Sequence, residues 1–118
     1  MTPQEIASRL VTYCRNSEWI RALQELYADN AVSIEPIETP DFAKVTKGKQ
    51  QMLAKADKFT GMTKEMHSVE LSEPVVAGNA FALRLDMDIT TTNGRTKMSE
   101  ICVYETRDGK IVSEQFFY

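Results

Sequence analysis

Alternating apolar and polar residues over the last forty positions, Asn79 to Tyr118, predict three antiparallel strands. From Phe81 to Ile89 every second residue is apolar, which is the period of a strand with one buried face. Two turns, Asn93-Gly94 and Arg107-Asp108-Gly109, divide the stretch. Asn-Gly between alternating strands is a strong hairpin signal because both residues tolerate positive φ. The pattern therefore predicts a curved antiparallel sheet with one apolar face.

The first turn predicts which side chains share the buried face with Phe81. When Asn93 and Gly94 form a two-residue loop, three strand pairs follow on that face: Met87 with Glu100, Leu85 with Cys102, and Leu83 with Tyr104. Glu100 is therefore expected among apolar side chains.

The second turn leaves two registers open. A three-residue loop with Gly109 in the left-handed conformation and a bulge pairs Cys102 with Glu114 and buries three further residues: Val112, Phe116 and Tyr118. A two-residue Asp108-Gly109 loop would instead turn Ser113, Gln115 and Phe117 inward. We prefer the first register because it buries three apolar side chains together. It places Glu100 and Glu114 on one apolar surface.

The first half of the chain has mainly the period of helices. Thr2-Pro3-Gln4-Glu5 is a capping box with proline at the first helical position, and Asn16-Ser17 ends this helix. A second helix carries an apolar stripe from Trp19 to Tyr27, and Asp29-Asn30 ends it. A third runs from about Lys49 to Phe59, with Gly61 as its C-cap.

Two more strands complete the pattern. Residues 31–35 form a short strand closed by Pro36, and residues 36–47 form a loop long enough to act as a rim or lid. A further strand has His67, Val69 and Leu71 on its inner side. The order of elements predicts one α+β domain over residues 1–118, with three helices packed on one face of a strongly curved antiparallel or mixed sheet. Any part of this cone that side chains leave empty is an internal pocket.

Composition narrows the classes of function. The chain has 118 residues, a formal charge of −3 and no Lys/Arg cluster, which argues against nucleic acid or an anionic membrane as partner. No apolar run approaches the roughly 20 residues of a membrane span, and we expect no signal peptide before Thr2. Cys14 and Cys102 are far apart in sequence, and we expect them to be reduced, buried thiols of a cytoplasmic protein.

The candidate catalytic residues are Glu35, Glu100, Glu114 and His67. Carboxyl groups crowded against apolar walls have raised pKa values, because burial and like charge both disfavour ionisation, and such groups can act as acid or base near neutral pH. The alternative is that they only bond one another, the backbone and water. No two ligands have a recognised metal spacing, so we expect neither metal nor cofactor. The expected pocket walls are Tyr104, Cys102, Trp19, Phe81, Leu83, Leu85, Met87, Val69, Val112, Phe116 and Tyr118.

The opposite face of the predicted sheet carries apolar residues that a monomer would expose. Ile101, Val103 and Phe117 lie there, beside Arg84 and Gln115. We therefore expect a homodimer through this face.

Four segments resemble the SnoaL-like branch of the nuclear-transport-factor-2-like superfamily: ELYADNAVSIEP from Glu25, KGKQQM from Lys47, MHSVELSEP from Met66, and ETRDGKIVSEQFFY from Glu105. The resemblance spans essentially the whole chain and implies a cone-shaped fold with a pocket. The chain is also distantly similar to ketosteroid isomerase, an enzyme in which a carboxylate base lies just before a proline at the end of the first strand. Glu35 before Pro36 matches that position. The isomerase's protonated acid falls at or near Cys102, one inward position from Glu100.

Three hypotheses follow. The first is a cofactor-independent enzyme of the isomerase, cyclase or dehydratase type, acting on an apolar small molecule with Glu35 as base. The second is a non-catalytic, ligand-binding homodimer. The third is a structural partner module. Fold alone does not separate them.

Overall fold

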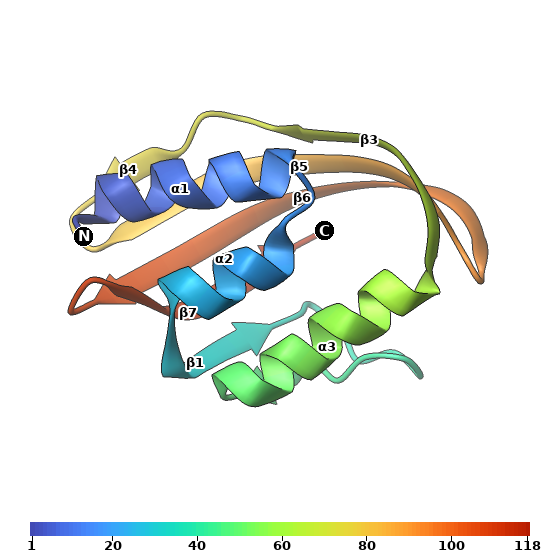
Figure 1. Cartoon of the computed structure of the whole chain (residues 1–118), viewed down its shortest axis with the longest axis horizontal. Coiled ribbons are helices and arrows are strands. Elements are labelled where there is room, and N and C mark those ends of the chain that lie inside the picture. Colours follow the sequence, from blue (N-terminus) through green and yellow to red (C-terminus); the bar gives the residue numbers. More distant parts are fainter.

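The computed structural model describes residues 1–118 and has three helices packed against one curved, seven-stranded sheet (Figure 1). The helices are α1 (Pro3–Arg15), α2 (Trp19–Leu26) and α3 (Lys49–Met62). The strands are β1 (Tyr27–Ile34), β2 (Val45–Lys47), β3 (Thr63–Leu71), β4 (Val75–Ala77), β5 (Ala80–Thr91), β6 (Gly94–Arg107) and β7 (Lys110–Phe117). The predicted α+β class is confirmed.

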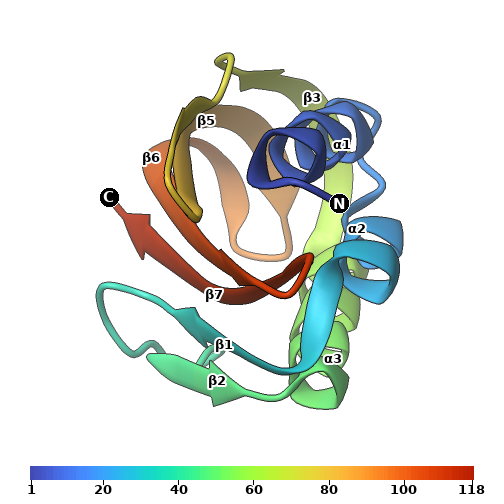
Figure 2. The ribbon, with the colours of Figure 1, turned by 90° about the vertical axis from the view of Figure 1, so that its left-hand side faces the viewer.

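The sheet is mixed, in the order β2-β1-β7-β6-β5-β3, and β4 also pairs with β5. Only the β1–β7 pair is parallel; the other pairs are antiparallel. The end view in Figure 2 shows the strands curving around one side while the three helices close the other. A curved sheet under helices encloses the interior in which the site lies. No helix is long and apolar enough to span a lipid bilayer.

The predicted capping box starts α1. The Thr2 hydroxyl accepts from the Glu5 amide at 3.2 Å, and the Glu5 carboxylate accepts from the Thr2 amide at 3.1 Å. This helix then buries Ile6 and Leu10 against the sheet. The amphipathic spacing in the sequence identified both the element and its inward face.

Two predicted helix ends are wrong. Asp29 and Asn30 lie within β1, because α2 passes directly into the strand at Tyr27. Their side chains are exposed, and the β1–β7 pairing shifts register between Tyr27 and Val32, which accommodates them. Gly61 is likewise inside α3 and not a cap, since α3 ends at Met62 and β3 begins at the next residue. Turn-forming residues therefore lie where one element runs straight into another.

The β5–β6 register differs from the predicted one by two residues. Thr92 and Asn93 form the loop, and Thr91 pairs with Gly94. Leu85 therefore lies opposite Glu100, with Leu83 opposite Cys102 and Phe81 opposite Tyr104. A shift of two leaves every side chain on its original face, because the strand period is two. Glu100 accordingly stays on the concave face.

The β6–β7 turn is the two-residue loop that we did not prefer. Asp108 and Gly109 have φ values of 52° and 78°. A bulge at Val112 follows, since Glu105 pairs with Ser113 whereas Thr106 pairs with Ile111. The extra residue reverses the alternation, so Glu114 and Phe116 reach the concave face as expected. Ile111 takes the core position that we assigned to Val112.

Candidate functional site

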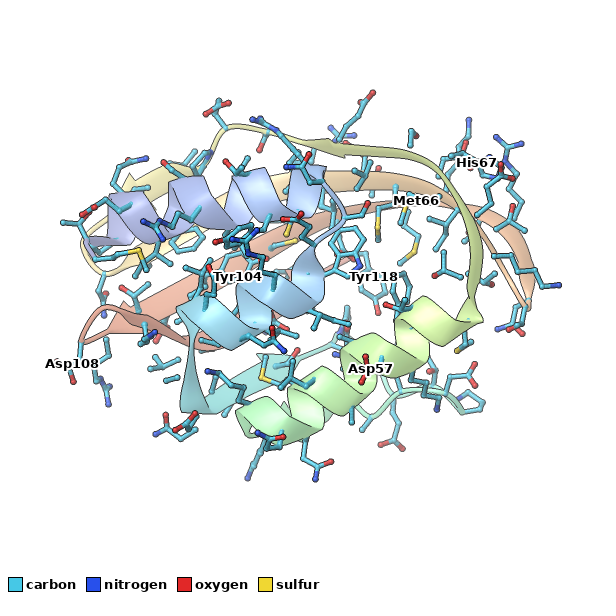
Figure 3. All side chains as sticks on the ribbon, viewed as in Figure 1. Asp57, Met66, His67, Tyr104, Asp108 and Tyr118 are labelled. Atoms are coloured by element: carbon cyan, nitrogen blue, oxygen red, sulfur yellow. The ribbon has the colours of Figure 1, made fainter.

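A cavity of about 250 Å³ lies between the concave face of the sheet and the three helices. Twenty residues line it, and sixteen of them are hydrophobic. Figure 3 shows Tyr104 and Tyr118 in this central region. The predicted wall residues that lie on the cavity are Trp19, Leu85, Met87, Tyr104, Phe116 and Tyr118, and the predicted acids on it are Glu35, Glu100 and Glu114.

Five other residues predicted as walls do not line the cavity. Phe81, Leu83 and Cys102 belong to the close-packed core, because α1 packs directly over their part of the sheet. Val69 pairs with Met87 on β5 but stays outside the cavity, and the bulge removes Val112. For most of these residues, the sequence correctly predicted that they lie on the concave face of the sheet. It did not predict which part of that face a helix covers.

His67 is not part of the site. A bulge in β3 lies at this residue, since Met66 pairs with Ile89 and Ser68 with Asp88. Its ring contacts the Thr90 hydroxyl at 2.8 Å, and Thr90 lies on the outer face of β5. Figure 3 shows His67 at the far end of the molecule from Tyr104. No group of three or more His, Cys, Asp and Glu side chains forms a candidate metal site.

Glu35 is held at the end of β1, just before Pro36. Its amide donates to the Lys44 carbonyl at 2.7 Å, which ties the two ends of the 36–44 loop together. Its carboxylate accepts from the Lys55 ammonium at 3.1 Å and from the Tyr118 hydroxyl at 3.3 Å. The side chain is only 16% exposed. Glu35 is thus an oriented, half-buried carboxylate beside a cation.

Glu114 is the deepest of the three acids. The parallel β1–β7 register places Ser33 beside it, and the Ser33 hydroxyl donates to the carboxylate at 2.6 Å. The Tyr27 hydroxyl donates to the other oxygen. Burial raises the pKa of Glu114, and these two hydrogen bonds offset only part of that effect. Both oxygens of Glu114 are already occupied by protein donors.

Glu100 differs because no strong donor contacts it. Its residue is 9% exposed, and the nearest polar partner is the Cys102 thiol at 3.8 Å. Burial, followed by the negative charge of Glu35, raises the pKa of Glu100 to about 7. This side chain therefore gains and loses a proton close to neutral pH. That property is required of a general acid or base.

Three polar residues of the site were not identified from the sequence: Lys55, Tyr27 and Ser33. Lys55 lies on α3 in the inward stripe of Met52 and Phe59, and its ammonium contacts both Ser33 and Glu35. A lysine inside an apolar stripe was the available signal. Tyr27 ends the apolar stripe predicted for the second helix, and the available signal was that a buried phenol needs a hydrogen-bond acceptor such as Glu114.

The mouth of the cavity is formed by Tyr118 and the loop after Pro36. Tyr118 is 57% exposed, and its hydroxyl has a pKa raised to about 12 by partial burial and by the Glu35 charge. It therefore remains a hydrogen-bond donor. Phe42 closes the loop side, where Lys58 lies 5.2 Å from its ring. The expected rim function of this loop agrees with that position.

The chain belongs to the SnoaL-like domain family, whose model matches residues 1–118. A proposed SnoaL-like polyketide cyclase from Mesorhizobium loti is 32% identical, with a TM-score of 0.91 and full coverage of both chains. None of the curated proteins matches the chain.

More distant solved structures share the fold. A protein with a cystatin-like fold from Xanthomonas campestris is 16% identical, and the match covers 99% of this chain and 90% of that one, with a TM-score of 0.84. A protein with a ketosteroid isomerase-like fold from Catenulispora acidiphila, solved with trimethylamine, is 17% identical, covers 100% and 87%, and has a TM-score of 0.73. This chain therefore shares the fold of these proteins, and its cavity has the size of a small molecule.

Proposed function

We propose that this protein is a cofactor-independent enzyme that transfers protons within a small, largely apolar molecule. The isomerase, cyclase and dehydratase classes fit this chemistry. The observation that carries the proposal is the contrast between two carboxyl groups in one apolar cavity. Glu35 lies 3.1 Å from an ammonium, which favours its charged form, whereas the pKa of Glu100 is raised to about 7. Environments that separate two such groups in this way assign one as base and one as acid.

In the proposed reaction, Glu35 removes a proton from a carbon of the substrate. Protonated Glu100 donates its proton to the substrate oxygen on which negative charge develops. In an isomerisation, Glu35 then delivers its proton to a different carbon, and Glu100 recovers its proton from the substrate oxygen. In a dehydration, the proton of Glu100 leaves with the substrate hydroxyl as water, and solvent carries the proton of Glu35 back to Glu100. No oxidant or cofactor is required. The polyketide cyclase assignment of the Mesorhizobium loti relative supports this reaction class. Glu114 does not exchange a proton with the substrate in this scheme. It acts indirectly, through its hydrogen bonds with Ser33 and Tyr27.

The polar groups occupy a small part of an otherwise apolar wall. Sixteen of the twenty lining residues are hydrophobic, and Trp19, Phe42 and Phe59 supply aromatic surface. Such a cavity favours a flat, mostly apolar substrate with one polar edge, for example a carbonyl next to an acidic C–H.

A chromogenic probe can test the base without knowledge of the natural substrate. 5-Nitrobenzisoxazole opens to a coloured phenolate when a base removes the C3–H proton of its isoxazole ring. We expect saturable turnover by the wild type and a loss of about 100-fold or more in kcat/KM for Glu35→Gln, the range of general base catalysis. Glu38→Gln, on the exposed part of the same loop, is the matched control.

Thermal shift with the same probe separates the two main hypotheses. Unchanged kcat/KM in the Glu35→Gln variant would remove Glu35 as the base. A probe that raises Tm in every variant but never turns over would favour the non-catalytic binding module, because binding alone stabilises the folded state.

We also propose that the protein forms a homodimer through the outer face of the sheet. Ile101 and Phe117 pair across β6 and β7 and are 45% and 49% exposed. Val103 and Gln115 form the next pair along these strands, and Arg84 lies opposite Ile101 on β5. Light scattering should find a dimer that Phe117→Asp converts to a monomer. Ile37→Asp, at an exposed apolar residue of the loop after Pro36, should leave the dimer intact.

A further inference from the structure

Lys55 is the only cationic residue among those lining the cavity, and it faces three acids. Its ammonium donates to Glu35 at 3.1 Å and to the Ser33 hydroxyl at 3.2 Å, and it lies 5.8 Å from the Phe116 ring. The side chain is only 19% exposed. A half-buried ammonium that contacts one of the three acids directly influences which of them carries the negative charge.

Ser33 connects this lysine to the deepest acid. The Ser33 hydroxyl has one proton, and it donates that proton to Glu114 at 2.6 Å. Its lone pairs are then free to accept from Lys55. The resulting hydrogen-bond chain runs from Tyr27 through Glu114 and Ser33 to Lys55 and Glu35. It fixes the end of a long, flexible lysine side chain on one side of the cavity.

We propose that Lys55 is a positioning residue that determines which of the two carboxyl groups keeps the negative charge, and that Ser33 and Glu114 hold Lys55 in place. The inference rests on the proposed acid–base function, because it explains how Glu35 and Glu100 come to have different roles.

The physical argument is a competition between neighbouring charges. Two carboxylates in one apolar cavity disfavour each other's ionisation, so one of them tends to keep a proton. The charged or titratable groups around Glu35 are Lys55 on α3, Glu100 on β6, Glu114 on β7 and Tyr118 at the chain end. Only Lys55 is a cation, and it contacts Glu35 and not Glu100. The ammonium therefore breaks the symmetry in favour of a charged Glu35.

Carbon-13 NMR titration of the glutamate carboxyl groups tests this directly. In the wild type, Glu35 should ionise at clearly lower pH than Glu100. In Lys55→Met, the ionisation of Glu35 should move upward by about one pH unit or more, so that the two groups share a proton. Lys55→Arg should restore the separation. Lys64→Met, at an exposed lysine just after α3, is the matched control and should leave both titrations unchanged.

Ser33→Ala gives a second route if Lys55→Met fails to fold. Removing the hydroxyl leaves the ammonium present but unanchored, so a smaller upward movement of Glu35 ionisation is expected. Unchanged titration of Glu35 in both variants would overturn the inference.

The same variants in the 5-nitrobenzisoxazole assay link the inference to catalysis. The acid limb of the pH–rate profile should move upward in Lys55→Met by the amount seen in the NMR titration. A shift by NMR without any turnover in the wild type would support the inference and reject the proposed function. Turnover in the wild type, with an acid limb that does not move in Lys55→Met, would support the proposed function and reject the inference.

Discussion

The concave face of the β5–β6 hairpin is filled at one end and hollow at the other. Beneath α1, the side chains of Phe81, Leu83 and Cys102 are between 0% and 4% exposed and pack in the core. Further along the same two strands, Leu85 and Glu100 face the cavity. Both halves come from strands with the same alternation of inward and outward residues. The difference therefore arises from what lies across from each half.

Tyr104 contacts both halves. Its ring stacks on Phe81 with 4.8 Å between centroids, and it also forms part of the cavity wall. On the filled side the inward residues are apolar, whereas the hollow side collects Glu35, Lys55 and Glu100. Buried ionisable groups are costly unless they have partners or access to water, and the hollow half supplies both. A region that is not close-packed can therefore contain ionisable side chains that a close-packed core cannot.

The largest expected effect comes from truncating the filled half. Phe81→Ala should lower the free energy of unfolding by about 3 to 5 kcal/mol, because it removes a fully buried ring and leaves a cavity. Leu85→Ala, four residues further along the same strand, enlarges a space that is already empty and should cost less than about 2 kcal/mol. Urea denaturation measures both. Equal losses would mean that the two halves are packed alike.

The fold was predictable from the sequence because alternation tolerates certain errors. The β5–β6 register was misplaced by two residues, yet Glu100 and Tyr104 were still assigned to the concave face, since an even shift preserves the face. Glu35 was identified through the resemblance to ketosteroid isomerase, in which a carboxylate precedes a proline at the end of the first strand. The strand period was sufficient for Glu100 and Tyr104.

The rest of the site depends on tertiary structure. Bulges at His67 and Val112 each reverse the alternation locally, and no residue at either position signals one. Lys55 reaches Glu35 only because α3 packs across β1, and the angle of that packing is not encoded in the period of the helix. Whether an inward side chain meets a helix or a void is likewise decided by the curvature of the sheet.

The second prediction concerns the ionisable group that the hollow half tolerates. The pKa of Glu100 is about 7 in the folded protein, against an ordinary value of 4.5. The folded state therefore binds this proton more tightly than the unfolded chain. Stability from this group is complete below pH 4.5 and is lost as the pH rises through about 7, a loss of about 3 kcal/mol.

Glu100→Gln removes this titration and should raise Tm relative to the wild type at pH 8 but not at pH 5. The buried Glu114 titrates in the same direction, so the variant should retain part of the pH dependence. Glu105→Gln, exposed on the outer face of the same strand, is the matched control. An identical fall in Tm from pH 5 to pH 8 in the wild type and the Glu100→Gln variant would show that Glu100 is no more strained in the hollow half than a surface acid.

The smallest expected effect tests whether the backbone entropy of a glycine limits the stability of α3, the helix over the hollow half. Gly61 lies in the last turn of α3, has no positive φ, and a Cβ added there would meet no atom within 4 Å. Gly61→Ala should therefore raise the free energy of unfolding by about 0.5 to 1 kcal/mol, since alanine loses less backbone entropy in a helix. Gly78→Ala, at φ +56°, should instead destabilise the protein. If Gly61→Ala stabilises the protein and leaves probe turnover unchanged, the cavity is preformed under a stable helix. Reduced turnover in a more stable protein would show that this end of α3 has to move for a ligand to enter.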